Sequence, residues 1–225
     1  MSIIFDHFLL YSMNPEKTFE NIKAKYGFEE IYPIRNFGYF KSGMLWIGNS
    51  KLEILYYPKE IPAPNSNDSE TRFVGIALKT NMPPEETLKA LREKGLETSE
   101  ILNEDVLDAN GKNVTVAKVI LLKGYCEDFR IFFIFDLLDT FIKREEELKK
   151  RNSILLSEFT ISISNKDKVE KVFDLLFLKD SSEIYFDTSG IAMNVSEKKK
   201  GGWEISEFIL KEGDLKIDLV EAKIP

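Results

Sequence analysis

The stretch IIFDHFLLY at residues 3–11 reads as a mostly apolar strand, and the residues that follow it decide the fold. Residues 14–16 (Asn-Pro-Glu) supply a capping side chain and a proline for the first turn of a helix, and Gly27 ends that helix. Strand-like runs then follow at short intervals, separated mainly by glycine and asparagine, at residues 28–34, 39–42, 45–47 and 52–57. The order is therefore one strand, one helix and three or four strands.

The same order begins again twice. A strand at residues 73–79 precedes a helix that residues 83–85 (Pro-Pro-Glu) open and Gly95 ends, and an alternating strand at 158–163 precedes a helix that Asn165 can cap. Further strands of the second unit are expected at residues 97–102, 113–122 and 130–135. Such repetition predicts an α+β fold of repeated βαβββ modules, which form curved, cup-like mixed sheets with helices on the outside. We expect paired modules within residues 1–136 (1–58 and 72–136), a connecting helix over 137–156 and a third, degenerate module over 157–225.

The composition excludes several functional classes. With 31 Lys and Arg against 38 Asp and Glu, the net charge is −7, which argues against nucleic acid as a partner. The lone cysteine, Cys126, excludes an internal disulfide, and any histidine-based centre depends on His7, the single histidine. The longest apolar run, residues 131–135, is far shorter than the ~20 residues that cross a bilayer, and the N-terminus has no basic region of a signal peptide. We expect a cytoplasmic chain with no membrane partner.

Two short motifs carry a family resemblance. Residues 6–8 (Asp-His-Phe) on the opening strand and 52–54 (Leu-Glu-Ile) on the last strand of the first unit, with the glycine-punctuated hairpin between them, resemble the vicinal oxygen chelate superfamily, and within it the glyoxalase-like domains. The resemblance implies that a histidine on the first strand and a glutamate on the last strand bind a divalent metal inside the cup. His7 and Glu53 fall on these positions, and their donor atoms suit Zn, Fe, Mn or Ni.

The second unit departs from that pattern. Gly75 stands where the second histidine would be, and the strand at residues 130–135 offers an aromatic residue where the second carboxylate would be. The third unit has no histidine. The resemblance therefore implies an incomplete set of metal ligands in one copy of this chain.

Both candidate ligands also have structural interpretations. His7 is a metal ligand, a general base or a histidine satisfied by a neighbouring hydrogen bond. Glu53 alternates with Leu55 and Tyr57 on one face of an apolar strand, so its carboxylate must be paired, coordinated or protonated. The structural alternative for Glu53 is an ion pair with an arginine, for which the candidates are Arg35, Arg72 and Arg130.

A second group of residues has the chemistry of a pocket lining. Tyr39, Trp46 and Tyr57 can line a pocket for a flat or apolar ligand, and with Arg130 they are the predicted ligand-binding residues. The alternative is that these aromatic side chains belong to the core or to its rim.

Three functions follow from these observations. The first is a metal-dependent lyase, isomerase or dioxygenase of the glyoxalase-like type, acting on a small molecule with vicinal oxygens. The second is a metal-free module that keeps the cup and binds or sequesters a small molecule. The third is a structural role as a homodimer, because an odd third unit leaves a strand edge unpaired. The sequence assigns no catalytic residue.

Overall fold

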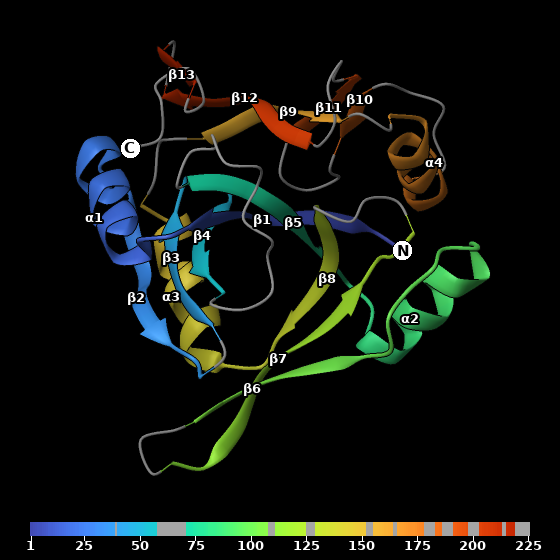
Figure 1. Ribbon diagram of the computed structural model, residues 1–225, viewed down its shortest axis with the longest axis horizontal. Coiled ribbons are helices and arrows are strands. Elements are labelled where there is room, and N and C mark those ends of the chain that lie inside the picture. Colours follow the sequence, from blue (N-terminus) through green and yellow to red (C-terminus); the bar gives the residue numbers. More distant parts are fainter. Residues whose placement is uncertain are drawn as a thin grey trace.

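The computed structural model describes residues 1–38, 40–57, 71–107, 111–124, 129–151, 155–163, 166–177, 183–185, 191–197, 203–212 and 215–218 (Figure 1). The first half contains β1 (Ile3–Ser12), α1 (Pro15–Tyr26), β2 (Glu29–Asn36), β3 (Lys41–Trp46), β4 (Lys51–Tyr56), β5 (Thr71–Thr80), α2 (Pro84–Glu93) and β6 (Leu102–Leu107). The second half contains β7 (Asn113–Leu121), β8 (Arg130–Asp136), α3 (Asp139–Lys149), β9 (Leu155–Ile163), α4 (Lys166–Phe177), β10 (Glu183–Tyr185), β11 (Ala192–Glu197), β12 (Trp203–Glu212) and β13 (Leu215–Asp218).

Two copies of the same strand arrangement form one eight-stranded sheet, in the order β2-β3-β4-β1-β5-β8-β7-β6. Within each copy the opening strand pairs in parallel with the last strand, β1 with β4 and β5 with β8. The copies meet where β1 and β5 pair antiparallel, and the sheet curls into an open half-barrel (Figure 1). The predicted α+β fold of repeated, cup-like βαβββ modules is confirmed.

Local signals fix the helix that follows β1. The Asn14 side chain accepts a hydrogen bond from the backbone N–H of Lys17, and Pro15 occupies the first turn. Gly27 ends the helix with a left-handed φ of 68°, a conformation that glycine adopts without a steric penalty. The helix buries Phe19 and Ile22 against the convex face of the sheet.

Two strand predictions were wrong in detail. The expected runs at 39–42 and 45–47 are one continuous strand, β3, because Gly43 is not a turn residue. A Cβ at Gly43 would lie 2.7 Å from the backbone nitrogen of Ile34, so this glycine lets β2 approach β3 closely. The strand expected at 97–102 begins later, as β6, and Thr98 makes only an isolated bridge to Leu122.

The convex face carries the main hydrophobic core. Phe8 and Phe5 of β1 point to this face, and the ring of Phe159 on β9 packs against them at centroid distances of 4.8 and 5.1 Å. The five-stranded sheet β10-β11-β9-β12-β13 thus lies outside the half-barrel, above β1 and β5 in Figure 1. The Asn49 side chain also attaches this sheet to the half-barrel. Its Oδ1 accepts a hydrogen bond from the backbone N–H of Leu156, and its Nδ2 donates one to the Leu156 carbonyl.

The C-terminal sheet repeats the pairing at the centre of the large one. Its β9 pairs in parallel with β11 and antiparallel with β12, as β1 pairs with β4 and β5. Within the described residues, β9, α4, β10 and β11 follow one another in the order strand, helix, strand, strand.

The connecting segment contains α3, and this helix also packs against the large sheet. Its Leu148 is fully buried, and the Phe141 ring stacks on Tyr32 of β2 at 4.8 Å. The helix lies beside β2, β3 and β4 (Figure 1) and faces the inside of the half-barrel. None of the helices in the described ranges is both long and apolar enough to span a membrane.

Candidate functional site

Strand register places the two candidate ligands on the concave face. Leu9 lies opposite Glu53 and His7 opposite Lys51 in the parallel β1–β4 pair, so His7 and Glu53 point to the same side. They line a cavity of about 60 Å³ inside the half-barrel. Its charged side chains include Asp6, His7, Lys51, Glu53, Glu104 and Asp136, and its aromatic side chains are Tyr32, Phe37, Phe40, Phe132 and Phe141.

A β-bulge brings Asp6 to the same side as His7. Neighbours on a regular strand point to opposite faces, but the β1–β5 register shifts between Phe5 and His7, which leaves Asp6 as the extra residue. The His7 Nδ1–H donates to Oδ2 of Asp6 at 2.6 Å. The acid therefore fixes the ring orientation and directs Nε2 towards Glu53.

His7 is fully buried, and its Nε2 lies 3.3 Å from Oε2 of Glu53. This is an ion-pair distance, but the geometry makes no hydrogen bond, and Nε2 has no hydrogen-bond partner within the described part of the chain. Burial alone would lower the pKa of His7, but the hydrogen bond to Asp6 and the close negative charges of Asp6 and Glu53 raise it to about 9. The imidazole is thus a cation at neutral pH.

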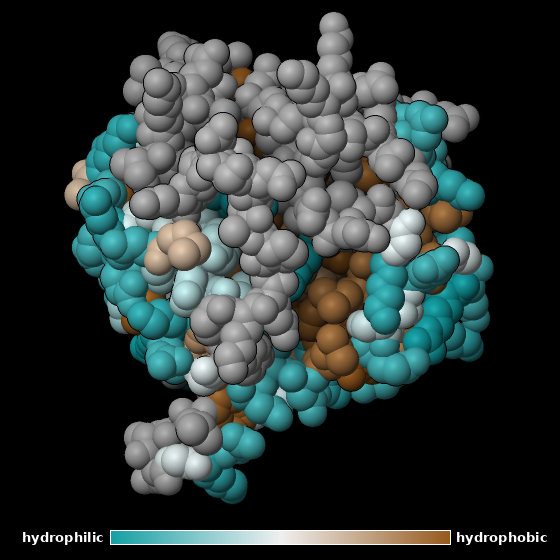
Figure 2. Space-filling model, in the orientation of Figure 1, coloured by the Kyte–Doolittle hydropathy of each residue, from teal (hydrophilic) through white to brown (hydrophobic). Residues whose placement is uncertain are grey.

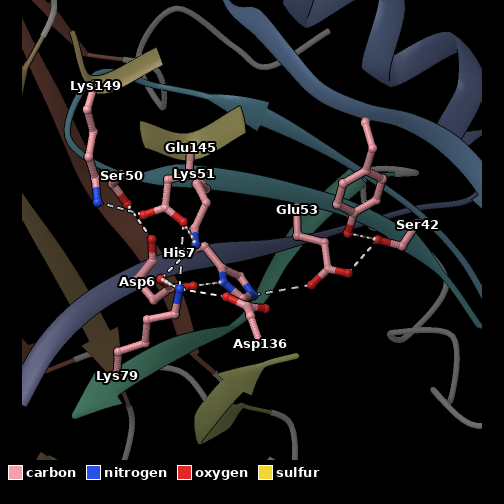
Figure 3. A network of polar contacts seen from close by, with 11 residues as sticks. Asp6, His7, Ser42, Ser50, Lys51, Glu53, Lys79, Asp136, Glu145 and Lys149 are labelled. Carbon is pink, nitrogen blue, oxygen red and sulfur yellow. Dashed lines mark hydrogen bonds and ion pairs between the residues drawn. The ribbon is translucent and has the colours of Figure 1, made fainter. Parts of the chain in front are cut away.

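Two lysines neutralise Asp6. The Lys51 and Lys79 ammonium groups lie 2.7 and 2.9 Å from its Oδ1 (Figure 3). Burial would raise the pKa of Asp6, but these two cations and His7 hold it well below its usual value. Asp6 therefore stays ionised behind the imidazole.

The network extends to β8 and α3. Lys79 lies 2.6 Å from Oδ2 of Asp136, and Lys51 lies 3.0 Å from Oε2 of Glu145, which Lys149 also contacts at 2.8 Å. Figure 3 shows these groups clustered on one side of His7, with Glu53 on the other. The ion pairs thus attach α3 to the wall of the cup.

Hydrogen bonds orient Glu53 from the other side. The Ser42 hydroxyl donates to its Oε1, and the Tyr32 hydroxyl donates to Ser42 at 3.3 Å. Burial and the charge of Glu53 raise the pKa of Tyr32 well above its usual value, so this phenol stays protonated. Among the described residues the ionic partner of Glu53 is His7, and the arginines that the sequence offered as alternatives stack on tyrosine rings instead.

Glu104 of β6 is a third cavity acid that the sequence analysis missed. Its carboxyl group has no ion pair within the described part of the chain. Burial and then the charge of Glu53 raise its pKa to about 7. Only the assembled sheet reveals it, since β6 reaches the cup through its pairing with β7 at the far edge.

The predicted ligand-binding residues do not gather around the cavity. Trp46 is 1% exposed and is not part of the lining. Tyr57 and Arg130 lie against each other, with the guanidinium 5.0 Å from the ring centroid, further along the concave face. Tyr39 lies outside the described residues, as does Cys126.

The backbone leaves no space for a second histidine. In the β5–β8 register, Phe132 lies opposite Ala77, as Glu53 lies opposite Leu9 in the first unit. Phe132 therefore occupies the second glutamate position. Gly75, two residues before Ala77, occupies the second histidine position. A Cβ at Gly75 would lie 2.4 Å from the carbonyl oxygen of Arg130. The backbone therefore leaves no room for a side chain there.

These donors do not fit the four-ligand metal centre that the family resemblance implies. Among the described residues, no cluster of three or more His, Cys, Asp or Glu side chains has the geometry of a metal site. His7 must also lose a proton to bind a metal, and its raised pKa opposes that loss.

Comparison with known proteins supports the fold alone. No protein-family model and no curated protein matches the sequence. A crystal structure of a hypothetical protein from Staphylococcus aureus matches with a TM-score of 0.68 at 13% identity, over 95% of this chain and 92% of that one. A mutant of 4-hydroxymandelate synthase from Streptomyces coelicolor matches with a TM-score of 0.56 at 12% identity, over 92% and 71%. A variant of methylmalonyl-CoA epimerase from the same organism, in complex with 2-nitronate-propionyl-CoA, matches over 60% and 98%, with a TM-score of 0.42 at 18% identity.

Proposed function

We propose that this chain, whose fold is that of the vicinal oxygen chelate superfamily, binds a small molecule in the cup beside His7 and Glu53 without a four-ligand metal centre. The observation that carries the proposal is the Nε2 of His7. It is buried, faces the cavity and makes no hydrogen bond among the described residues, since its contact with Oε2 of Glu53 at 3.3 Å is an ion pair without hydrogen-bond geometry. A buried polar atom without a partner costs free energy, and a ligand oxygen would satisfy it.

The walls around this atom suit a small ligand. Aromatic and aliphatic side chains form most of the lining, and a few polar groups converge at one place, which is typical of ligand pockets. A cavity of about 60 Å³ holds only a few water molecules. The ligand, or the part of it that enters, is therefore small.

The two polar groups suggest what that part contains. The protonated imidazole of His7 donates a hydrogen bond, and the Glu53 carboxylate accepts one. Neighbouring oxygens, one an acceptor and one a hydroxyl donor, match this pair, as in a 2-hydroxy acid or a hydroxyketone. Both side chains are held in place from behind, by Asp6 and by Ser42.

Calorimetry and thermal shift with a panel of small 2-hydroxy acids and hydroxyketones test the proposal. We expect a member of the panel to bind the wild type and to bind Glu53→Gln at least tenfold more weakly. Glu30→Gln is the matched control, because Glu30 forms a half-exposed ion pair with Lys23 outside the cup. Equal affinity in Glu53→Gln and the wild type, or no binding by the whole panel, would overturn the proposal.

A metal-dependent lyase, isomerase or dioxygenase is the second candidate. One observation favours it, because histidines that bind metals usually donate their other ring N–H to a carboxylate, as His7 does to Asp6. The metal content of protein purified without chelators decides between the two functions. One ion per chain that is lost in His7→Ala would establish the metal-dependent function, and no bound metal would exclude it.

A further inference from the structure

We infer that Arg72 and Arg130 form an anion-binding site at the other end of the concave face. The inference deepens the proposed function and rests on it, since it assigns a carboxylate or phosphate group to the small molecule that the cup binds. Arg72 of β5 lies opposite Tyr11, and Arg130 of β8 lies opposite Gly75, so the two arginines come from neighbouring parallel strands.

The charge distribution on the concave face singles out these two arginines. Lys51 and Lys79 each have carboxylate partners within 3.0 Å. Within the described ranges, neither Arg72 nor Arg130 has an acidic partner. A guanidinium keeps its charge at any physiological pH, so neighbouring strands hold two half-buried cations that have no acidic partner among the described residues.

One of their nitrogens is buried without a partner. The Nε of Arg72 is inaccessible to solvent and has no hydrogen-bond partner among the described residues. Leaving a charged donor in this state is costly, whereas an anion at the same place would accept its hydrogen bond. This is an observation independent of the charge count, and it indicates the same kind of ligand.

Tyrosine rings hold both arginines in position. The Arg72 guanidinium lies 5.7 Å from the ring centroid of Tyr11, and Arg130 lies 5.0 Å from that of Tyr57. Tyr57 in turn stacks on Phe40, which lines the cavity. A guanidinium stacked in this way keeps its N–H groups at the edge, where they can form a fork with a carboxylate or phosphate.

The anion site lies within reach of the His7–Glu53 pair. Arg130 is two residues before Phe132, whose ring packs 5.9 Å from that of His7, and two strand residues span roughly 6.6 Å. Gly75 allows the close approach of β5 to Arg130. Between the two ends lie apolar residues of the concave face, including Leu9, Leu55 and Val74, and Figure 2 shows an apolar area over β7 and β8. A small organic acid or phosphate ester fits this order of an anion site, an apolar surface and the polar His7–Glu53 pair.

Isothermal titration with inorganic phosphate and with glycerol phosphate tests the site in the full chain. We expect Arg72→Gln and Arg130→Gln each to weaken phosphate binding at least tenfold. Arg35→Gln is the matched control, because Arg35 also stacks on a tyrosine but is exposed on β2, and it should bind phosphate as the wild type does. Tighter binding of glycerol phosphate than of inorganic phosphate would show that the anion belongs to an organic ligand, and equal binding would show a site for the free anion.

The Glu53→Gln variant separates this inference from the proposed function. It should retain phosphate affinity, because Glu53 lies in the cavity and not at the arginines. Phosphate binding that is absent in the wild type, or unchanged in both arginine variants, would overturn the anion site while leaving the cup ligand untouched. Circular dichroism of each variant shows that a loss of binding is not a loss of fold.

Discussion

Asp6 and His7 are adjacent on β1, yet their side chains bond to each other at 2.6 Å on the same side of the sheet. A regular strand would point them to opposite faces, and the bulge at Asp6 removes that alternation. The bulge therefore positions groups on both sides of the imidazole. Asp6 joins the buried lysines to the imidazole, and the imidazole presents Nε2 beside Glu53.

We expect Asp6→Asn to destabilise the protein by about 3–5 kcal/mol, since removing one partner of a buried ion pair leaves the others uncompensated. Lys51 would keep Glu145 and Lys79 would keep Asp136, but both ammonium groups and His7 would lose their shared anion. Urea unfolding at pH 7 measures the change. The control is Glu30→Gln, which removes a half-exposed ion pair and should cost less than about 1 kcal/mol. Equal losses in the two variants would show that Asp6 is not the centre of the network.

His7 should make stability depend on pH between 6.5 and 9. Its pKa rises from 6.5 to about 9 in the folded protein, so the folded state binds the proton more tightly than the unfolded state. The resulting stabilisation is complete below pH 6.5 and is lost as the pH rises through 9. Its size is about 3 kcal/mol, from 1.36 kcal/mol per pKa unit.

Urea unfolding from pH 6 to 10 measures this loss, and His7 is the single histidine of the chain. The His7→Asn variant should lack this decline, whatever its absolute stability. A wild-type profile that stays flat from pH 7 to 9 would contradict the cationic imidazole that the ligand proposal requires.

Glu104 should also make stability fall as the pH rises, but in a lower range than His7. Burial and the charge of Glu53 raise its pKa from 4.5 to about 7, so ionising it costs the folded protein stability as the pH rises from 4.5 to 7. We expect Glu104→Gln to be more stable than the wild type at pH 8, by about 3 kcal/mol, and equally stable at pH 4. Chemical denaturation at the two pH values measures the difference. The exposed Glu93 provides a control, since Glu93→Gln should change little at either pH.

The sequence predicts the scaffold well because its signals are local. Proline, asparagine and glycine mark the ends of α1 and α2, and apolar alternation marks the strands, so the repeated module is visible without the structure. Alternation on β4 also predicts that Glu53, Leu55 and Tyr57 share a face, and the register of β1 and β4 agrees.

The remainder of the site depends on tertiary contacts. The bulge at Asp6 breaks the alternation from which faces are predicted, so nothing local shows that this acid lies beside His7. The α3 segment reads as a solvated connector because most of its residues are charged, but Glu145 turns inward to Lys51 once Leu148 and Phe141 pack. The lysine at position 51, at the start of an otherwise largely apolar strand, is a sequence signal that could have indicated the network.

The last prediction concerns Gly75, at the position where the resemblance implies a second metal ligand. We expect Gly75→Ala to destabilise the protein by about 1–3 kcal/mol, because its Cβ would lie 2.4 Å from the carbonyl oxygen of Arg130 and 3.0 Å from the Cβ of that residue, and β5 and β8 would have to separate. Val74→Ala on the same strand is a control for a small change in side-chain volume without a backbone clash.

The double variant Gly75→His with Phe132→Glu introduces the two missing ligand residues. It should gain no metal affinity over the wild type by titration with Zn²⁺, since the imidazole has no space to reach the cup. Tight stoichiometric zinc binding by that variant would show that the backbone adapts, and that the absence of the second pair is a matter of residue identity and not of strand geometry.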